Sequence, residues 1–120
     1  MGCQADTSWL IALLDGEDHH HAEAVAQFES LKIPPAISVF TIAEVLSCFP
    51  TRRSQRAKKL KEAFPSIVAV ETAVATRAAD IRVEYQVSLG DAIIIALALA
   101  EKQELLTFDQ KMKAIYERLA

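Results

Sequence analysis

The pattern of hydrophobic and polar positions predicts short strands that alternate with helices along the whole chain. Short apolar runs, which predict strands, occur at 3–5, 36–39, 67–70 and 105–108. Segments with helical periodicity occur at 9–14, 19–31, 42–46, 52–64, 72–86, 88–100 and 110–119. This alternation is typical of a parallel sheet covered by helices on both faces. We therefore expect one α/β domain over residues 1–120, a three-layer α/β/α sandwich around a mainly parallel sheet.

The most apolar segment is the predicted helix that follows Ser88 and Asp91. From Ala92 to Ala100 it contains no polar side chain. A helix that is apolar on all sides must be buried on nearly every face. Because this run is too short to cross a bilayer, we expect it to form the centre of the core rather than a membrane anchor.

Local signals give the expected ends of several elements. Asp6 or Thr7 should cap the first helix, while Thr41 and Thr51 are expected to cap the third and fourth helices. The first strand, over residues 3–5, is predicted from its position, because its composition is weak for a strand.

Composition narrows the class of protein. The chain has 120 residues, of which 52% are hydrophobic, and this argues against disorder. Its formal net charge of −3 is a poor match for a protein that holds DNA by bulk charge. Cys3 and Cys48 lie far apart without metal-type spacing, and the sequence shows no signal-peptide pattern. We expect reduced thiols and a cytoplasmic protein without a membrane segment.

Acidic residues occur at matching places in this pattern. Asp6 follows the first strand and Asp109 follows the last, while Glu44 and Asp91 lie near the starts of two helices. Ligands of such sheets bind at the carboxyl ends of the strands, so the carboxylates are expected to meet there. Helix capping is the simpler interpretation of any one acid alone. Together they would repel one another unless a hard cation such as Mg²⁺ or Mn²⁺ binds, which suits hydrolysis of phosphodiesters.

The acids also lie in recognisable motifs. The segments are Asp6-Thr7-Ser8, Thr41-Ile42-Ala43-Glu44-Val45, Gly90-Asp91-Ala92-Ile93-Ile94 and Leu106-Thr107-Phe108-Asp109. In this order they resemble the four acidic motifs of PIN-domain ribonucleases, and most of all the VapC-like toxins of toxin–antitoxin pairs. The resemblance covers essentially the whole chain. It implies that Asp6, Glu44, Asp91 and Asp109 form the catalytic and metal-binding cluster, with Asp6 and Asp91 as the most direct ligands.

The same resemblance implies an endoribonuclease that depends on Mg²⁺ or Mn²⁺. Its substrate would be single-stranded or loop RNA, because cleavage needs an accessible backbone. A small antitoxin protein would block the site, and the first helices would build a homodimer. Ser8, Thr107 and Arg82 match polar or basic positions that support the acids.

Two alternatives remain open from the sequence. A receiver domain that is phosphorylated on aspartate has a similar size and alternation of elements. Such domains have paired acids after the first strand, an aspartate after the third and a lysine after the last. Here Asp6 has no acidic neighbour, Glu71 follows the third strand and Asp109 ends the last. The second alternative is a PIN-like binding module that has lost cleavage.

Two further clusters have competing interpretations. Six of the 13 basic residues lie in the fourth helix: Arg52, Arg53, Arg56, Lys58, Lys59 and Lys61. They either hold RNA phosphates or form an ordinary solvated helix face. His19-His20-His21 is expected to be an exposed helix start rather than a metal site, since adjacent helical residues point in different directions. The inner side of that helix is predicted to carry Ala22, Val25 and Ala26, with either Leu31 or Phe28.

Overall fold

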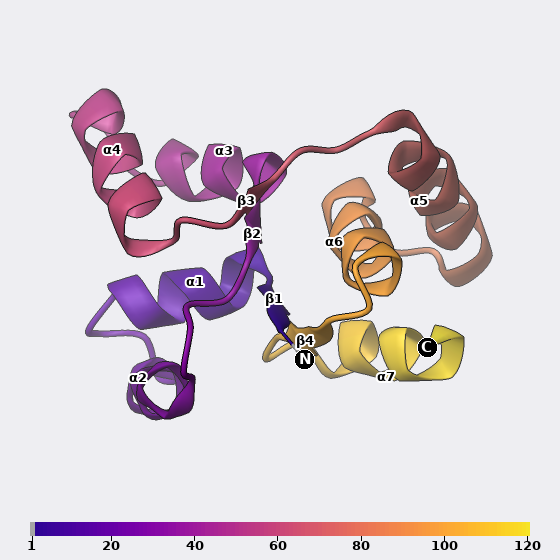
Figure 1. Cartoon of the computed structure of the whole chain (residues 1–120), viewed down its shortest axis with the longest axis horizontal. Coiled ribbons are helices and arrows are strands. Elements are labelled where there is room, and N and C mark those ends of the chain that lie inside the picture. Colours follow the sequence, from indigo (N-terminus) through magenta and orange to yellow (C-terminus); the bar gives the residue numbers. More distant parts are fainter. Residues whose placement is uncertain (1) are drawn as a thin grey trace.

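The computed structural model describes residues 2–120, and its strands lie between two groups of helices (Figure 1). The strands are β1 (Cys3–Ala5), β2 (Ile37–Ser38), β3 (Ile67–Val68) and β4 (Glu104–Leu106). The helices are α1 (Thr7–Leu14), α2 (His21–Ser30), α3 (Val39–Ser47), α4 (Arg53–Ala63), α5 (Thr72–Tyr85), α6 (Leu89–Ala100) and α7 (Gln110–Leu119). The predicted alternation of strands and helices is confirmed.

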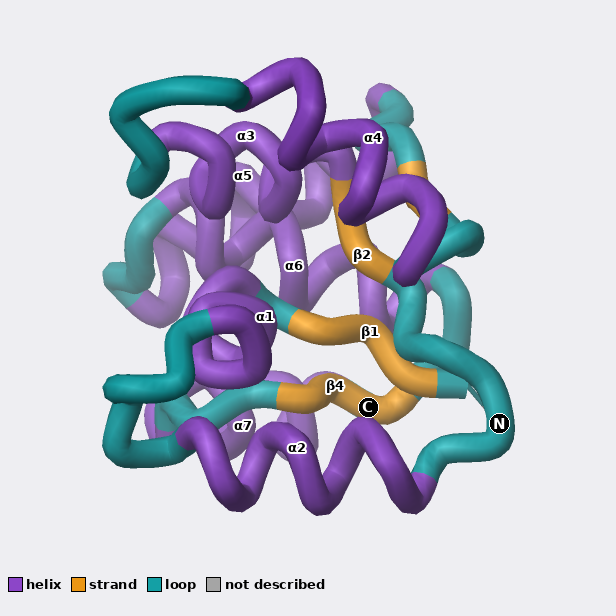
Figure 2. The backbone as a smooth tube through the Cα atoms, turned by 90° about the vertical axis from the view of Figure 1, so that its left-hand side faces the viewer, coloured by secondary structure: helices purple, strands orange, loops and turns teal. Residues whose placement is uncertain are grey.

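The sheet is short and parallel. β1 pairs with β4, and β2 pairs with β3, both in parallel. A single bridge between Gln4 and Ala36 connects the two pairs, so the spatial order is β4-β1-β2-β3. Figure 2 shows β1 between β4 and β2, with α1 and α2 in front of the strands and α6 behind them. The predicted three-layer α/β/α architecture with a mainly parallel sheet is confirmed.

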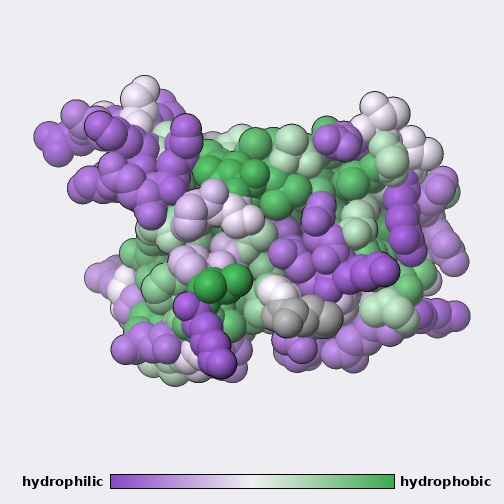
Figure 3. Space-filling model, viewed as in Figure 1, coloured by the Kyte–Doolittle hydropathy of each residue, from purple (hydrophilic) through white to green (hydrophobic). Residues whose placement is uncertain are grey.

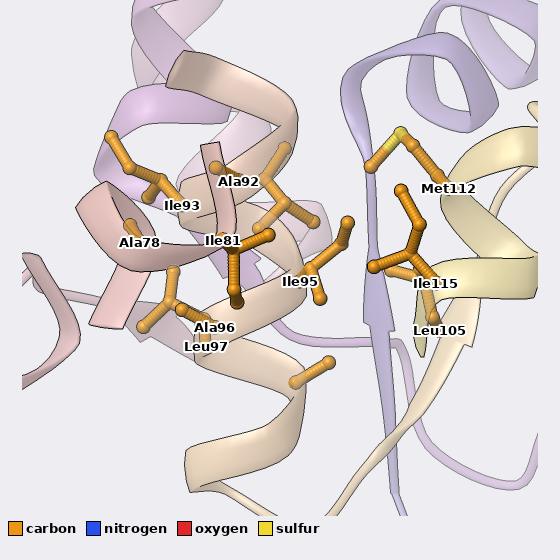
Figure 4. Packing of buried hydrophobic residues seen from close by; sticks show 12 residues of the cluster. Ala78, Ile81, Ala92, Ile93, Ile95, Ala96, Leu97, Leu105, Met112 and Ile115 are labelled. Carbon is orange, nitrogen blue, oxygen red and sulfur yellow. The ribbon is translucent and has the colours of Figure 1, made fainter. Parts of the chain in front are cut away.

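Two hydrophobic cores lie on opposite sides of the strands. The first packs α5, α6 and α7 over the sheet, and the second packs α1, α2, α3 and α4 over the other face. Every residue from Ala92 to Ala98 is buried, as the apolar run predicts. Figure 4 shows Ile95 of α6 and Ile115 of α7 pointing towards each other beside β1. Within residues 2–120, no helix is long and apolar enough to span a membrane.

The first strand forms despite its weak composition, although one of its residues, Gln4, destabilises the fold. Gln4 is completely buried and pairs with Leu105, a member of the first core. Paired residues of parallel strands point to the same face of the sheet, so the Gln4 side chain enters this apolar core. Both polar atoms of its amide group lack a hydrogen-bond partner within the described residues. Backbone pairing on both sides of β1 therefore holds the strand in place against an unfavourable side chain.

Some of the expected helix caps are wrong. Asp6 caps α1 as predicted, since its side chain accepts a hydrogen bond from the Trp9 amide. Ser38 rather than Thr41 caps α3, because β2 ends earlier than its apolar run suggests. Thr51 does not cap α4, which begins after Arg52 in the left-handed region at φ 60°. Short strands and tight turns moved these boundaries by one or more residues.

The inner face of α2 agrees with the prediction only in part: Phe28 lies on it as predicted, but the predicted alanines do not. Ala24 is its buried residue, whereas Ala22 and Ala26 are exposed and Val25 is half-buried. Alanine contributes little apolar surface, so alanine spacing alone fixes the rotation of a helix poorly. Aromatic contacts decide it instead: Phe28 packs near Trp9 and Phe64, with ring centroids 6.4 and 5.9 Å away.

Candidate active site

Asp6 and Asp109 lie on the same edge of the sheet because the strands that precede them, β1 and β4, are parallel partners. The amide of Asp6 donates to the Leu106 carbonyl over 3.0 Å, which fixes the end of β1 against β4. Each aspartate caps the helix that follows it: Asp6 caps α1, and Asp109 caps α7. Capping orients a carboxylate at a helix start and does not prevent it from facing a ligand.

The Asp6 carboxylate is buried and heavily hydrogen-bonded. One oxygen accepts from the Trp9 amide at 2.8 Å and from the Ser8 hydroxyl at 2.9 Å. The other accepts from the Thr107 hydroxyl at 2.5 Å and from Ser8 at 3.0 Å. Burial raises the pKa of Asp6, the hydrogen bonds oppose this rise, and the negative charge of Asp91 adds to it. The hydrogen bonds therefore hold the Asp6 carboxylate in place, although burial and the charge of Asp91 disfavour its ionised form.

Thr107 connects the first acid to the last. Its hydroxyl donates to Asp6 and accepts a hydrogen bond from the Asp109 amide at 2.9 Å. One side chain thus sets both the orientation of Asp6 and the start of the turn into α7. The sequence comparison placed Thr107 and Ser8 beside the acids, and both contact Asp6 directly.

Glu44 reaches the same rim from α3. One of its oxygens accepts a hydrogen bond from the Thr7 hydroxyl at 2.5 Å, so the neighbour of Asp6 holds it. Its other oxygen lies 3.4 Å from the position that a side-chain carbon on Gly90 would occupy. The same carbon would lie 2.6 Å from the Phe40 ring, closer than real contacts allow. Only glycine lets the start of α6 approach α3, and this brings Glu44 beside Asp91.

Asp91 occupies the first turn of α6, and Ser88 is the residue that caps the helix. The sequence interpretation of Asp91 as a cap is therefore wrong, which leaves its carboxylate free of that role. Its side chain is half-buried, and burial is the main cause of its raised pKa. A hydrogen bond from Ser88 opposes the rise, while the charges of Asp109 and Glu44 increase it. All four carboxylates are thus electrostatically or structurally connected.

No described cation offsets this negative charge. Within residues 2–120 the only ion pair joins His20 and Glu23, which are 3.8 Å apart. Arg82 is exposed on α5, and the acids of the rim form no ion pair with it. The described residues hold no group of three or more histidine, cysteine, aspartate or glutamate side chains close enough to hold a metal ion. The donor chemistry, oxygen atoms of mutually repelling carboxylates, fits a hard divalent cation.

Thr7 is a site residue that sequence reasoning missed. It follows Asp6 directly and was weighed only as a helix cap, although its hydroxyl holds Glu44, 37 positions away. The signal that could have found it is its place in the first acidic motif. Every residue of such a motif is a candidate for contact with another acid of the rim.

The basic residues of α4 lie on a projecting, exposed helix, which Figure 3 shows as a hydrophilic lobe. Two of them have structural contacts of their own. The guanidinium of Arg56 lies 4.1 Å from the centre of the Phe49 ring, and Arg53 donates to the Leu46 carbonyl at 3.3 Å. Arg53 and Arg56 therefore have structural contacts within the protein, and a role of the basic residues in RNA binding stays a prediction.

A family model described as PIN domain matches residues 5–118. Among solved structures, a toxin–antitoxin complex from Klebsiella pneumoniae contains a similar chain, with 32% identity and a TM-score of 0.79. The match covers 94% of this chain and 91% of that one. No curated protein sequence matches the chain.

Two more distant structures share the fold. VapC20 of Mycobacterium tuberculosis, a sarcin–ricin loop cleaving toxin, has a TM-score of 0.81 at 20% identity and covers 94% of each chain. VapBC2 of Rickettsia felis, bound to a promoter DNA fragment, has a TM-score of 0.70 at 15% identity. That match covers 95% of this chain and 92% of the other.

Proposed function

Because this chain belongs to the PIN-domain family, we propose that it is an endoribonuclease whose active site is the acidic rim. The observation that carries the proposal is the set of four carboxylates from separate parts of the chain: Asp6, Glu44, Asp91 and Asp109. The charge of Asp91 adds to the rise that burial causes in the pKa of Asp6, the charges of Asp109 and Glu44 do the same for Asp91, and none of these acids is ion-paired within residues 2–120. A receiver domain, the alternative of another fold family, is excluded by the family match.

The chain's own residues have distinct tasks in this proposal. Asp6 is held immobile by its hydrogen bonds and supplies a fixed carboxylate. Glu44 is oriented by Thr7, while Asp91 is half-buried and close enough to Asp109 and Glu44 for their charges to raise its pKa. The hydroxyls of Thr7, Ser8 and Thr107 among these groups each donate to a carboxylate and orient it. We therefore propose attack by water rather than a covalent intermediate on a side chain.

The carboxylates would hold Mg²⁺ or Mn²⁺, with Asp6 and Asp91 as the main ligands. A divalent cation bound there supplies an acidic water and charge neutralisation at phosphate. The protein supplies the fixed positions of the oxygen ligands. We also propose single-stranded or loop RNA as the substrate, because the backbone must be accessible on both sides of the cut.

The direct test combines Mn²⁺ titration calorimetry with cleavage of a labelled single-stranded RNA. We expect the wild type to bind Mn²⁺ and to cut RNA in Mg²⁺ or Mn²⁺ but not in EDTA. The Asp6→Ala protein, purified in parallel, should do neither. Cleavage by both proteins would identify a contaminant, and a folded wild type that neither binds metal nor cuts RNA would contradict the proposal.

Replacing Thr107 by valine should lower cleavage by about 10- to 100-fold, the range found when groups that orient metal ligands are removed. Valine keeps the shape but neither donates to Asp6 nor accepts from the Asp109 amide. Thr107→Ser retains the hydroxyl and should remain near wild type. The matched control is Thr76→Val, since Thr76 is exposed on α5 and bonds only a carbonyl of its own helix. Equal rates for Thr107→Val and wild type would show that the hydroxyl does not position Asp6.

We further propose a small antitoxin as the partner, supported by the similarity to a chain of the Klebsiella pneumoniae complex. Two adjoining hollows of about 260 and 290 Å³ lie between α1, α3 and α4 and share Leu14 and Phe49. Leu14 is 47% exposed, and Arg56 and Lys59 line the second hollow. This surface suits a peptide with apolar and acidic residues. Light scattering of the protein alone and with a co-expressed antitoxin tests this partner and the proposed homodimer.

A further inference from the structure

Three aromatic rings form a stack next to the acidic rim. The His20 ring lies parallel to Phe108, with centroids 4.3 Å apart and an angle of 4° between the planes. The His19 ring lies 4.1 Å from His20, tilted by 41°. Phe108 directly precedes Asp109, so the stack brings two rings from the α1–α2 connection to the last acid of the rim. The histidine run expected to be an ordinary surface helix start therefore has a specific long-range contact.

A hollow of about 410 Å³ separates these rings from α1. Its walls include His19, His20 and Phe108 together with Ser8 and Asp109. Ser8 bonds the Asp6 carboxylate, so the hollow opens directly onto the proposed catalytic groups. A group of the size of a nucleobase fits such a volume, and its phosphate would then lie near the acids.

The position of the stack is fixed by its backbone. The His20 amide donates to the Asp18 side chain at 2.8 Å, and the His21 ring contacts the Ala12 carbonyl at 2.8 Å. Phe108 packs against the second hydrophobic core. The rings thus form a platform whose geometry exists before a ligand binds, which lowers the entropic cost of binding.

The charges around the hollow decide which part of a nucleic acid it suits. Asp18 and Asp109 both line it, and their carboxylates would repel a phosphate group. The flat faces of the rings instead suit the flat face of an unpaired base. Base–aromatic stacking is the usual way in which proteins hold single-stranded RNA, and it tolerates different sequences.

We propose that the His19–His20–Phe108 stack binds one unpaired nucleobase of the RNA, next to the nucleotide that is cut. His19 is exposed, and the base enters the hollow that the three rings line together with Ser8 and Asp109. This inference rests on the proposed ribonuclease function and adds the way in which the substrate is held. It assigns a preference for unpaired RNA to the α1–α2 connection, because a paired base would first have to lose its pairing and stacking, at a cost in free energy.

The test measures binding rather than cleavage, in the Asp91→Asn background. Fluorescence anisotropy would compare a labelled hexaadenylate RNA with an abasic analogue of equal length and charge. We expect the RNA with bases to bind more tightly. The double variant H19L/H20L should weaken its binding by about 5- to 100-fold, as for loss of one stack, and leave the abasic analogue unchanged. The matched variant H19F/H20F keeps both rings and should retain the preference.

A second variant guards against misfolding, which circular dichroism would detect. Phe108→Leu keeps apolar bulk at the core and should reduce the same preference. Equal losses for both RNAs, or none in H19L/H20L, would overturn the stacking site. If the wild type cuts RNA while H19L/H20L binds and cuts equally well, only the stacking site fails. If the preference for bases is found but the wild type never cuts RNA, the proposed function fails and the stacking site stands.

Discussion

Replacing Asp91 by asparagine should abolish RNA cleavage while leaving the protein folded. Asparagine has nearly the same shape, but it removes one metal-binding oxygen charge from the rim. A loss of about 10³-fold in rate corresponds to roughly 4 kcal/mol of transition-state stabilisation, in the range that a metal ion supplies. Steady-state cleavage of a labelled RNA in Mg²⁺ measures the rate. Circular dichroism measures the fold.

The same variant should melt at a higher temperature than wild type in metal-free buffer at neutral pH. The pKa of Asp91 is raised in the folded protein, chiefly by burial and then by Asp109 and Glu44. Between the unfolded pKa, about 3.9, and the raised folded pKa, the native state binds more protons than the unfolded chain. Stability is therefore lost as pH rises through that window, and the penalty is complete once the pH exceeds the raised folded pKa. Asparagine has no such penalty, so we expect a rise of a few °C.

Added metal should reverse this difference, so that the wild type melts at a higher temperature than Asp91→Asn. Mn²⁺ binds the native wild type and raises its melting temperature by mass action, and the variant should gain less. Asp80→Asn is the matched control, because Asp80 is exposed on α5, and it should change neither rate nor melting temperature. An Asp91→Asn protein that is unfolded, or that cuts RNA at the wild-type rate, would show that Asp91 is not the functional ligand proposed.

Replacing Gln4 by methionine should stabilise the protein by about 1–3 kcal/mol, the cost of a buried polar group without partners. Methionine is unbranched and close to glutamine in size, so it fills the same space in the first core without new polar atoms. The backbone pairing of β1 with β4 is unaffected. We expect the melting temperature to rise by roughly 4–12 °C for a chain of this size, measured by thermal unfolding.

The control for this variant is Gln55→Met on the exposed face of α4, which should change stability by less than about 0.5 kcal/mol. Gln4→Glu should have the opposite effect, because it places a charge in an apolar core. A lower melting temperature for Gln4→Met would mean that the amide is satisfied in solution by a buried water that the methionine expels.

The architecture, and the sheet edge that Asp6 and Asp109 share, could be predicted from the sequence. Parallel strands end at one edge, so an acid placed after β1 and another after β4 had to meet there. The apolar run from Ala92 to Ala98 could be assigned to the core for an equally general reason: no other environment accepts it. These inferences rest on the order of strands and helices and on the difference between apolar and polar segments. Both can be seen in the sequence itself.

Contacts between distant residues could not be predicted in the same way. The Thr7 hydroxyl meets Glu44 across 37 positions, and the His20 ring meets Phe108 across the sheet edge. Such pairs depend on the rotation of each helix about its axis and on the conformation of the loops. The hydrophobic pattern of the sequence determines neither of them closely enough. The exposed Ala22 and the misplaced cap at Thr41 are errors of the same origin: small shifts in rotation or strand length.

The central place of β1 has a consequence for synthesis of the protein. β1 has β4, the last strand in the described residues, as a partner, and the hydrogen bond from Thr107 to Asp6 spans 101 positions. Contacts of such long range form late in folding. A nascent chain that still lacks β4 leaves Asp6 without the Thr107 hydroxyl and the Leu106 carbonyl, so the proposed site assembles only after synthesis has passed Asp109. If the proposed antitoxin is already present at that point, it meets the proposed nuclease as its site forms.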